Sequence, residues 1–228
     1  MSYVFKLSAI PTLSIDGSDQ LFPVHRIYCV GRNYAEHARE MGHDPDREPP
    51  FFFQKNPDTI VKSGGQFPYP DKSSHVHYEI ELVVALSKGG KNISESKAID
   101  CVYGYAVGLD MTRRDLQGEA KKLGRPWEVG KSFEYSAPCS NIFPVSKIGY
   151  PTDGRIWLKV NGKLKQEGSI NQLVWNIPET ISYLSGFFTL APGDLIFTGT
   201  PAGVGAIQPG DVMDGGVEGV GEISIAVV

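Results

Sequence analysis

Two glutamates stand two residues apart in HYEIEL (residues 77–82), and this spacing is the first sign of chemistry in the chain. In a strand, Glu79 and Glu81 share one face with their Cα atoms roughly 7 Å apart, so both carboxylates can reach a common point. The apolar run VVAL that follows is typical of a strand covered on both faces. Burial and mutual repulsion would raise at least one carboxyl pKa unless a cation lies between the two groups. A metal site and a solvated face both remain open for this pair.

A third carboxylate favours the metal site. Asp110 ends the apolar segment YAVGLD just before a predicted helix, a position where functional side chains often lie. Three carboxylates without clustered cysteine or histidine suit a hard cation, Mg²⁺ or else Mn²⁺ or Ca²⁺. Mg²⁺ keeps several waters, which leaves positions for a chelating substrate. Taken alone, Asp110 is equally well explained as an acid at a helix N-terminus.

A histidine and a glutamate form a second candidate group. His37 and Glu40 lie three residues apart in a helix predicted over residues 33–42, with Asn33 as a possible cap, so their side chains are neighbours. A carboxylate that orients a histidine raises its basicity and lets the pair take a proton from water. A surface pair on a polar helix is the simpler alternative. The Pro-rich, polar stretch 43–57 is typical of a mobile loop, so the helix is predicted to belong to a lid.

Two further segments carry candidate anion-binding groups. Lys131 in WEVGKSF has apolar neighbours, and a buried lysine needs an anionic partner; an exposed loop lysine is the alternative. The loop GTPAGVG (199–205) lacks the Gly-Lys-Ser/Thr of a P-loop. Its backbone N–H groups and the Thr200 hydroxyl can still hold a small carboxylate, although a plain turn is as good an explanation. No GxSxG or HExxH motif supports serine-hydrolase or zinc-peptidase chemistry.

The elements that must position these residues are mostly strands. ELVVAL and YGYAVGLDM read as buried strands, and Asn161-Gly162 between two alternating segments predicts a hairpin with a type I′ turn. Shorter helices are predicted over residues 112–124 and 177–186 from their capping and stop residues. Residues 1–20 read as a lead-in strand and turn, and residues 1–228 as a single domain.

Composition excludes several classes of protein. The net charge is −4 with no dense Lys/Arg run, which argues against a nucleic-acid-binding surface. No apolar run approaches the length of a membrane span, and the N-terminus has no apolar signal core. Three widely spaced cysteines exclude a full disulfide framework and a CxxC metal knuckle, and they indicate a reducing, cytoplasmic setting.

Six blocks taken in order carry a family resemblance. They are VGRNYAEHAREMG, HYEIEL, GYAVGLDMTRRDLQ, PWEVGKSF, LKVNGKLKQEG and GDLIFTGTPAGVG. Together they resemble the fumarylacetoacetate hydrolase superfamily, in particular its short acylpyruvate hydrolase branch. The segment FFFQKNPDTIV and the length are most similar to the bacterial fumarylpyruvate hydrolases of the gentisate pathway, which serves aromatic catabolism.

The resemblance implies a fold and a set of residue roles. The fold would be an α+β, β-rich roll with short helices and a lid, usually found as a homodimer. The implied roles are Mg²⁺ or Mn²⁺ binding by Glu79, Glu81 and Asp110, a lid dyad of His37 and Glu40, and substrate contacts by Arg114, Gln117, Lys131 and Thr200. Arg32 is a candidate for contact with a distal carboxylate of the acyl half, with a structural role as the alternative.

The implied reaction is metal-dependent hydrolysis of a C–C bond in a 2,4-dioxo acid, most simply fumarylpyruvate to fumarate and pyruvate. A decarboxylase or tautomerase of oxaloacetate or of catechol-pathway oxo acids uses the same metal chemistry and is the nearest alternative. A non-catalytic β-rich domain with a structural metal site is a third. His77 has no assigned role, and we expect it to support or pack against the site rather than to bind the metal.

Overall fold

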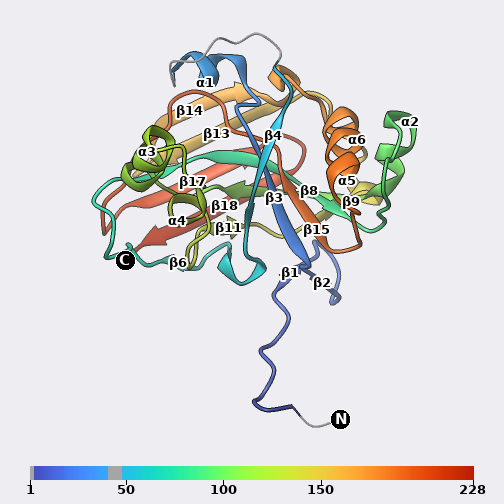
Figure 1. Cartoon of the computed structure of the whole chain (residues 1–228), viewed down its shortest axis with the longest axis horizontal. Coiled ribbons are helices and arrows are strands. Elements are labelled where there is room, and N and C mark those ends of the chain that lie inside the picture. The colour runs from blue at the N-terminus through green and yellow to red at the C-terminus, as the bar shows by residue number, and fades with distance from the viewer. Residues whose placement is uncertain (1–2, 41–47) are drawn as a thin grey trace.

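A large mixed sheet forms the centre of the protein (Figure 1). The computed structural model describes residues 3–40 and 48–228, apart from the side chains of residues 38–40. In spatial order the sheet contains β4 (Phe51–Lys55), β3 (Arg26–Gly31), β15 (Asp194–Phe197), β8 (Ile80–Leu86), β9 (Val102–Leu109), β11 (Ala137–Cys139) and β5 (Ile60–Lys62), with β12 (Phe143–Pro144) beside β9. β15 runs parallel to β3 and β11 parallel to β5, whereas β8 is antiparallel to both of its neighbours.

A second, largely antiparallel sheet packs against the first. Its strands are β14 (Lys163–Ser169), β13 (Arg155–Val160), β17 (Val212–Val217), β18 (Gly221–Val227) and β6 (Gln66–Phe67). Leu82 and Val84 of β8 share the core between the sheets with Leu158 of β13. Val83 and Ala85 point to the other face, into a separate apolar cluster. β8 is therefore covered on both faces, as its continuous apolar run predicts.

The segment HYEIEL is not one strand, which corrects the sequence-based reading. β7 (Val76–Tyr78) pairs with β10 (Thr112–Arg113) and β16 (Gly205–Ala206) in a small separate sheet, and the chain changes sheets at Glu79. The Ile80 N–H donates to the side chain of Gln166, at 3.0 Å, where a continuous ladder would have used the backbone. A glutamine from the neighbouring hairpin thus satisfies the polar group that the break would leave buried and unpaired.

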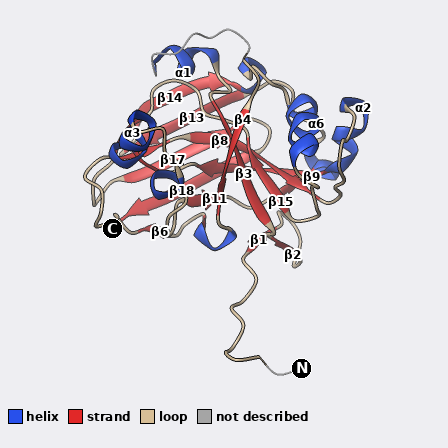
Figure 2. Ribbon diagram, viewed as in Figure 1, coloured by secondary structure: helices blue, strands red, loops and turns tan. Residues whose placement is uncertain are grey.

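Short helices lie around the edges of the sheets (Figure 2). They are α1 (Ala35–Glu40), α2 (Glu95–Ala98), α3 (Arg114–Lys122), α4 (Glu128–Lys131), α5 (Val145–Ile148) and α6 (Ile177–Phe187), with 3₁₀ turns at Pro57–Thr59, Ile99–Cys101 and Ile170–Gln172. α6 begins with a capping box in which Asn176 and Glu179 each accept a backbone N–H from the other. None of the described helices is both long enough and apolar enough to span a membrane.

Two local predictions have mixed outcomes. The hairpin is confirmed, since Asn161 and Gly162 join β13 to β14 with φ of 50° and 73°. The predicted mobile loop 43–57 is wrong over its second half, because residues 51–55 form β4 and pair with β3. Residues 43–47 lie outside the described part. Asn33, the predicted cap, precedes α1, and its side chain donates to Trp175 O and Thr198 O and accepts from Trp175 N.

The N-terminal part contains a short strand pair. β1 (Thr12–Ser14) pairs with β2 (Leu21–Pro23). Residues 3–10 run away from the body of the molecule without regular structure (Figure 1). Their apolar side chains are exposed, with 99% of Val4, 76% of Phe5 and 69% of Ile10 accessible. The three cysteines, Cys29, Cys101 and Cys139, are buried free thiols.

Candidate active site

Three carboxylates converge at the break between β7 and β8. Glu79 occupies the break, Glu81 lies on β8, and Asp110 follows β9 directly. The β8–β9 register pairs Ile80 with Leu109, so the Asp110 N–H donates to the Glu79 carbonyl at 2.9 Å. All three side chains are buried, and each offers an oxygen within 4.8 Å of the others. The antiparallel pairing, more than the i, i+2 spacing, is what brings the third acid to the first two.

Cationic side chains surround two of these acids. Lys131, at the end of α4, donates through Nζ to Glu79 Oε2 at 2.8 Å, Asp110 Oδ2 at 2.6 Å and Thr112 Oγ1 at 2.7 Å. Arg114, at the start of α3, pairs with the other oxygen of Glu79 through Nη2. The exposed-loop alternative for Lys131 is therefore wrong, since only 2% of the residue is accessible. Charged partners with several hydrogen bonds make a buried lysine tolerable.

Lys55 is a buried cation that sequence reasoning missed. Its Nζ lies 2.8 Å from Asp110 Oδ1 and donates to the carbonyls of Met111, at 3.0 Å, and Lys131. It ends the strand FFFQK, in which Phe51 and Phe53 lie on the same side as Lys55 because strand side chains alternate. That alternation was the available signal, but it was hidden because the segment reads as part of a Pro-rich loop.

The pKa values of the two glutamates move in opposite directions. Burial opposes ionisation of Glu79, but the nearby Lys131 and Arg114 outweigh it and hold the pKa of this carboxyl well below its usual range. Burial, reinforced by the negative Asp110 and Glu79, raises the pKa of Glu81 well above its usual range. The pKa of Lys131 is raised, since its two carboxylate partners overcome the burial that would lower it. Glu81 is thus the acid with the least local compensation.

The carboxylate group fits a divalent cation. Within the described residues, the positive side chains contact Glu79 and Asp110, whereas Glu81 Oε2 accepts the Gly199 N–H at 2.8 Å. Gly199 has a φ of 101°, and a Cβ there would approach the Asn33 Cβ to 2.8 Å, so a larger residue would displace this donor. A cation among the three oxygens would offset the repulsion that Glu81 meets. Oxygen-only ligands of this kind suit Mg²⁺ or Mn²⁺.

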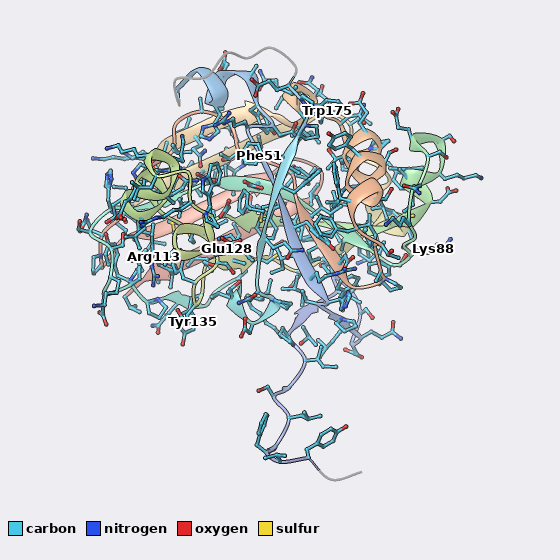
Figure 3. The ribbon with its side chains drawn as sticks, in the orientation of Figure 1. Phe51, Lys88, Arg113, Glu128, Tyr135 and Trp175 are labelled. Carbon is cyan, nitrogen blue, oxygen red and sulfur yellow. The ribbon has the colours of Figure 1, made fainter. Side chains whose placement is uncertain are left out.

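A cleft opens above the acids, and nearly all predicted site residues line it. They are Arg32, His37, Glu79, Glu81, Asp110, Arg114, Gln117, Lys131 and Thr200. Its remaining lining includes Phe53, Lys121, Trp127 and Phe51, which is labelled in Figure 3. His37 is a buried residue of α1. Glu40 is also in α1, but its side chain lies outside the described part of the chain.

The polar residues of the cleft are held by neighbours. Arg114 donates through Nη1 to Gln117 Oε1 at 2.7 Å, and the two lie on one face of α3. Thr200 Oγ1 accepts from Gln166 Nε2 at 2.8 Å, and the same nitrogen donates to Pro201 O. Gln166 therefore fixes both the Thr200 loop and the start of β8. This role was missed because Gln166 stands in a segment, LKVNGKLKQEG, that otherwise reads as an exposed hairpin.

His77 contacts a second histidine and Arg114. Its Nε2 lies 3.2 Å from His75 Nε2, and its Nδ1 accepts from Arg114 Nε at 3.4 Å. Burial, followed by the positive charge of Arg114, lowers the pKa of His77 to about 4. The neutral imidazole can therefore accept the hydrogen bond from Arg114 and help to position that side chain, which is the supporting role expected for His77.

Comparison with known proteins defines the class. Residues 26–228 match the family described as fumarylacetoacetate (FAA) hydrolase, C-terminal. The chain belongs to this family, and the expectation drawn from the six sequence blocks is confirmed. The mixed, sheet-rich architecture with few short helices is the fold of that domain.

Individual relatives are similar over most of the chain. A fumarylpyruvate hydrolase of Ralstonia sp. is 49% identical over 82% of this chain and 98% of its own length. The crystal structure of fumarylpyruvate hydrolase from Pseudomonas aeruginosa in complex with Mn²⁺ and pyruvate is similar with a TM-score of 0.97. Its sequence is 54% identical, and the similarity covers 100% of this chain and 99% of that one. A mitochondrial oxaloacetate tautomerase of Mus musculus is 47% identical over 85% of this chain and 87% of its own length.

Proposed function

We propose that this protein hydrolyses the C3–C4 bond of a 2,4-dioxo acid, namely fumarylpyruvate, to give fumarate and pyruvate. The observation that carries the proposal is the buried group of Glu79, Glu81 and Asp110 at the base of a cleft that His37 also lines. The similarity to fumarylpyruvate hydrolases, one of them solved with Mn²⁺ and pyruvate, supports it.

The carboxylates would hold Mg²⁺ or Mn²⁺. When bound, the cation supplies Lewis-acid polarisation of the substrate oxygens and offsets the negative charge that develops as the C–C bond breaks. Lys131 adds a second positive charge at the same place, where its two carboxylate partners overcome the effect of burial and raise its pKa. Lys55 holds Asp110 in position through the opposite oxygen from the one that Lys131 contacts.

Water activation falls to His37. We assign it the role of general base, with Glu40 orienting its ring. The imidazole takes one proton from a water whose oxygen attacks the C4 carbonyl carbon. The C3–C4 bond then breaks, its electron pair stays with the three-carbon fragment, and a proton added at C3 completes pyruvate. The four-carbon fragment leaves as the free acid.

The remaining cleft residues would orient the substrate. Arg114, Gln117 and Thr200 can contact the carboxylate and oxo groups of the pyruvate half, since all three line the cleft beside the carboxylate group. Arg32 would contact the acyl half. Orientation of this kind contributes several kcal/mol to catalysis.

Oxaloacetate chemistry is the second candidate, because relatives of similar identity are oxaloacetate tautomerases. A coupled pyruvate assay with Mg²⁺ and Mn²⁺, run on fumarylpyruvate, maleylpyruvate, acetylpyruvate and oxaloacetate, separates the two. Release of fumarate and pyruvate in equal amounts supports hydrolysis. If oxaloacetate alone reacts, with loss of CO₂ or with enol–keto exchange only, the hydrolase proposal is wrong. The non-catalytic alternative leaves His37 in the cleft without a role.

We further propose that the protein is a homodimer. The exposed apolar segment 3–10 extends away from the rest of the molecule (Figure 3). Packing against a second copy of the protein would cover its apolar side chains. Deletion of residues 1–10 should shift sedimentation velocity from dimer to monomer. An unchanged dimer would place the interface elsewhere.

The cellular setting is proposed from the chemistry. Three free thiols suit a reducing cytoplasm. Fumarylpyruvate cleavage would place the protein in gentisate degradation, and residues 1–228 would act as one catalytic domain. A gene for a gentisate dioxygenase beside this one would support that assignment, and growth on gentisate after deletion of this gene would contradict it.

A further inference from the structure

The more accessible part of the cleft carries positive charge that the hydrolytic steps above do not use. Arg32 and Lys121 both line the cleft, and both are more accessible than the buried acids. Lys121 was not singled out in the sequence, where it reads as one of several basic residues in the last turn of a helix. What these two cations bind bears on the choice of acyl group.

Arg32 is held in a costly conformation. It lies between β3 and α1 with a φ of 58°, a region that residues other than glycine rarely adopt, and such strain tends to persist where it serves a site. Its guanidinium lies 5.3 Å from the centre of the Phe51 ring. Its ion pair with Glu48 is long, at 3.9 Å, and the Glu48 side chain is 71% exposed, so the pair contributes little. The strain and the aromatic contact together fix the guanidinium at the cleft.

Lys121 extends a stripe along α3. Arg114, Gln117 and Lys121 are spaced i, i+3 and i+7, so they share one helix face, and all three line the cleft. The rise between Arg114 and Lys121 is about 10 Å. Burial, followed by the positive charges of Arg32 and Arg114, lowers the pKa of Lys121. Lys121 is thus close enough to both arginines to be repelled by them, and an anion between Arg32 and Lys121 would reduce that repulsion.

We propose that Lys121 and Arg32 together bind a second carboxylate, carried at the far end of the acyl half of the substrate. The enzyme would therefore select 2,4-dioxo acids with a carboxylate at both ends. Arg114 contacts Glu79 and lies at the pyruvate end, so Lys121, two turns along the helix, reaches the opposite end of a seven-carbon diacid. Phe51 and Trp127 supply aromatic walls for the flat conjugated chain between them. This inference rests on the proposed function.

The test compares two substrates that differ at one group. Fumarylpyruvate carries the distal carboxylate, and crotonylpyruvate carries a methyl group in its place. In the metal-loaded Lys121→Met variant we expect kcat/KM for fumarylpyruvate to fall about 10-fold to 100-fold, mainly through KM. The value for crotonylpyruvate should stay within about 2-fold of the wild type, since only the charge contact is lost. Arg32→Met should show the same selectivity for the charged substrate.

Controls separate the possible failures. Lys122→Met changes the exposed neighbour on the same helix and should leave both substrates unaffected. Lys121→Arg should restore most of the activity on fumarylpyruvate, which loss of folding would not allow. An equal loss on both substrates, or no loss on either, overturns the distal-carboxylate site alone. Absence of pyruvate release from both substrates by the wild-type enzyme overturns the proposed function, and this inference with it.

Discussion

The base and the rim of the cleft are built in different ways. At the base, the β8–β9 register places Glu79, Glu81 and Asp110, and the buried lysines Lys55 and Lys131 hold the first and the last of these acids. At the rim, His37 comes from the short helix α1, Arg32 from a strained turn and Lys121 from the end of α3. Ion pairs within the chain dominate the base, whereas the rim residues come from three separate segments that line the cleft.

This difference assigns separate tasks to the two regions. The base must hold like charges together in a buried place, so each of its residues affects both stability and metal binding. The rim must accept a substrate and a water, so its residues should affect turnover and selectivity with little effect on folding. Variants can test this division directly.

The largest effect is expected from Glu81→Ala at the base. Loss of one of three oxygen ligands should abolish tight Mn²⁺ binding, measured by isothermal titration calorimetry, and reduce kcat/KM by more than about 100-fold. The exposed Glu222→Ala variant serves as the control and should change neither quantity. Tight Mn²⁺ binding by Glu81→Ala would mean that the cation sits elsewhere.

His37→Ala should separate the rim from the base. We expect kcat to fall about 10²-fold to 10⁴-fold because the general base is lost, while Mn²⁺ binding stays near its wild-type value. The exposed Glu36→Ala variant on the same helix is the matched control. Undiminished cleavage by His37→Ala would rule out the proposed role of His37.

Lys55→Met tests the buried ion pairs. Removing one partner leaves Asp110 with less compensation, so the free energy of unfolding should fall by about 3–5 kcal/mol in denaturant titrations. The surface variant Lys62→Met should fall by less than about 0.5 kcal/mol. A small loss for Lys55→Met would show that Lys131 alone suffices to hold Asp110.

The smallest effect concerns pH. The folded-state pKa of Glu81 lies above its unfolded value, so its contribution to stability is present below the unfolded pKa and is lost as pH rises through the folded pKa. With a chelator present, the free energy of unfolding should therefore decline as pH rises above the usual pKa range of a glutamate, and Glu81→Gln should remove that part of the decline. Glu79 has the opposite sign, so its contribution is lost when pH falls below the usual range of a glutamate. Identical pH profiles for wild type and Glu81→Gln would contradict this assignment.

Much of the site could be predicted from short segments of sequence. Glu79, Glu81 and Asp110 each lie in or beside an apolar segment of the sequence. A charged side chain predicted to be buried indicates a functional site, because its burial costs free energy. The structure brings them together as expected, although Glu79 lies at a break between strands. That break depends on Gln166, which is 86 residues away, and local pattern gives no access to such a contact.

The functional residues that the sequence did not predict lie in segments whose neighbouring residues indicate a different structure or an ordinary surface position. Lys55 follows a Pro-rich segment that resembles a loop, and only pairing with β3 makes the segment a strand. Lys121 looks like an ordinary basic residue in the last turn of a helix. Its position becomes informative once α3 is seen to present Arg114, Gln117 and Lys121 to one cleft. Burial of polar side chains depends on tertiary packing, which periodicity does not encode.

The β8–β9 register has a consequence for how the protein folds. Antiparallel neighbours that are close in sequence can pair early, whereas contacts between distant segments are delayed by the entropy of closing long loops. The three acids all lie within residues 79–110, but Thr200 joins them from a distant part of the chain. A divalent cation present during refolding can therefore meet its ligands before the cleft exists, and nucleation around the ion would make the refolding rate depend on metal concentration.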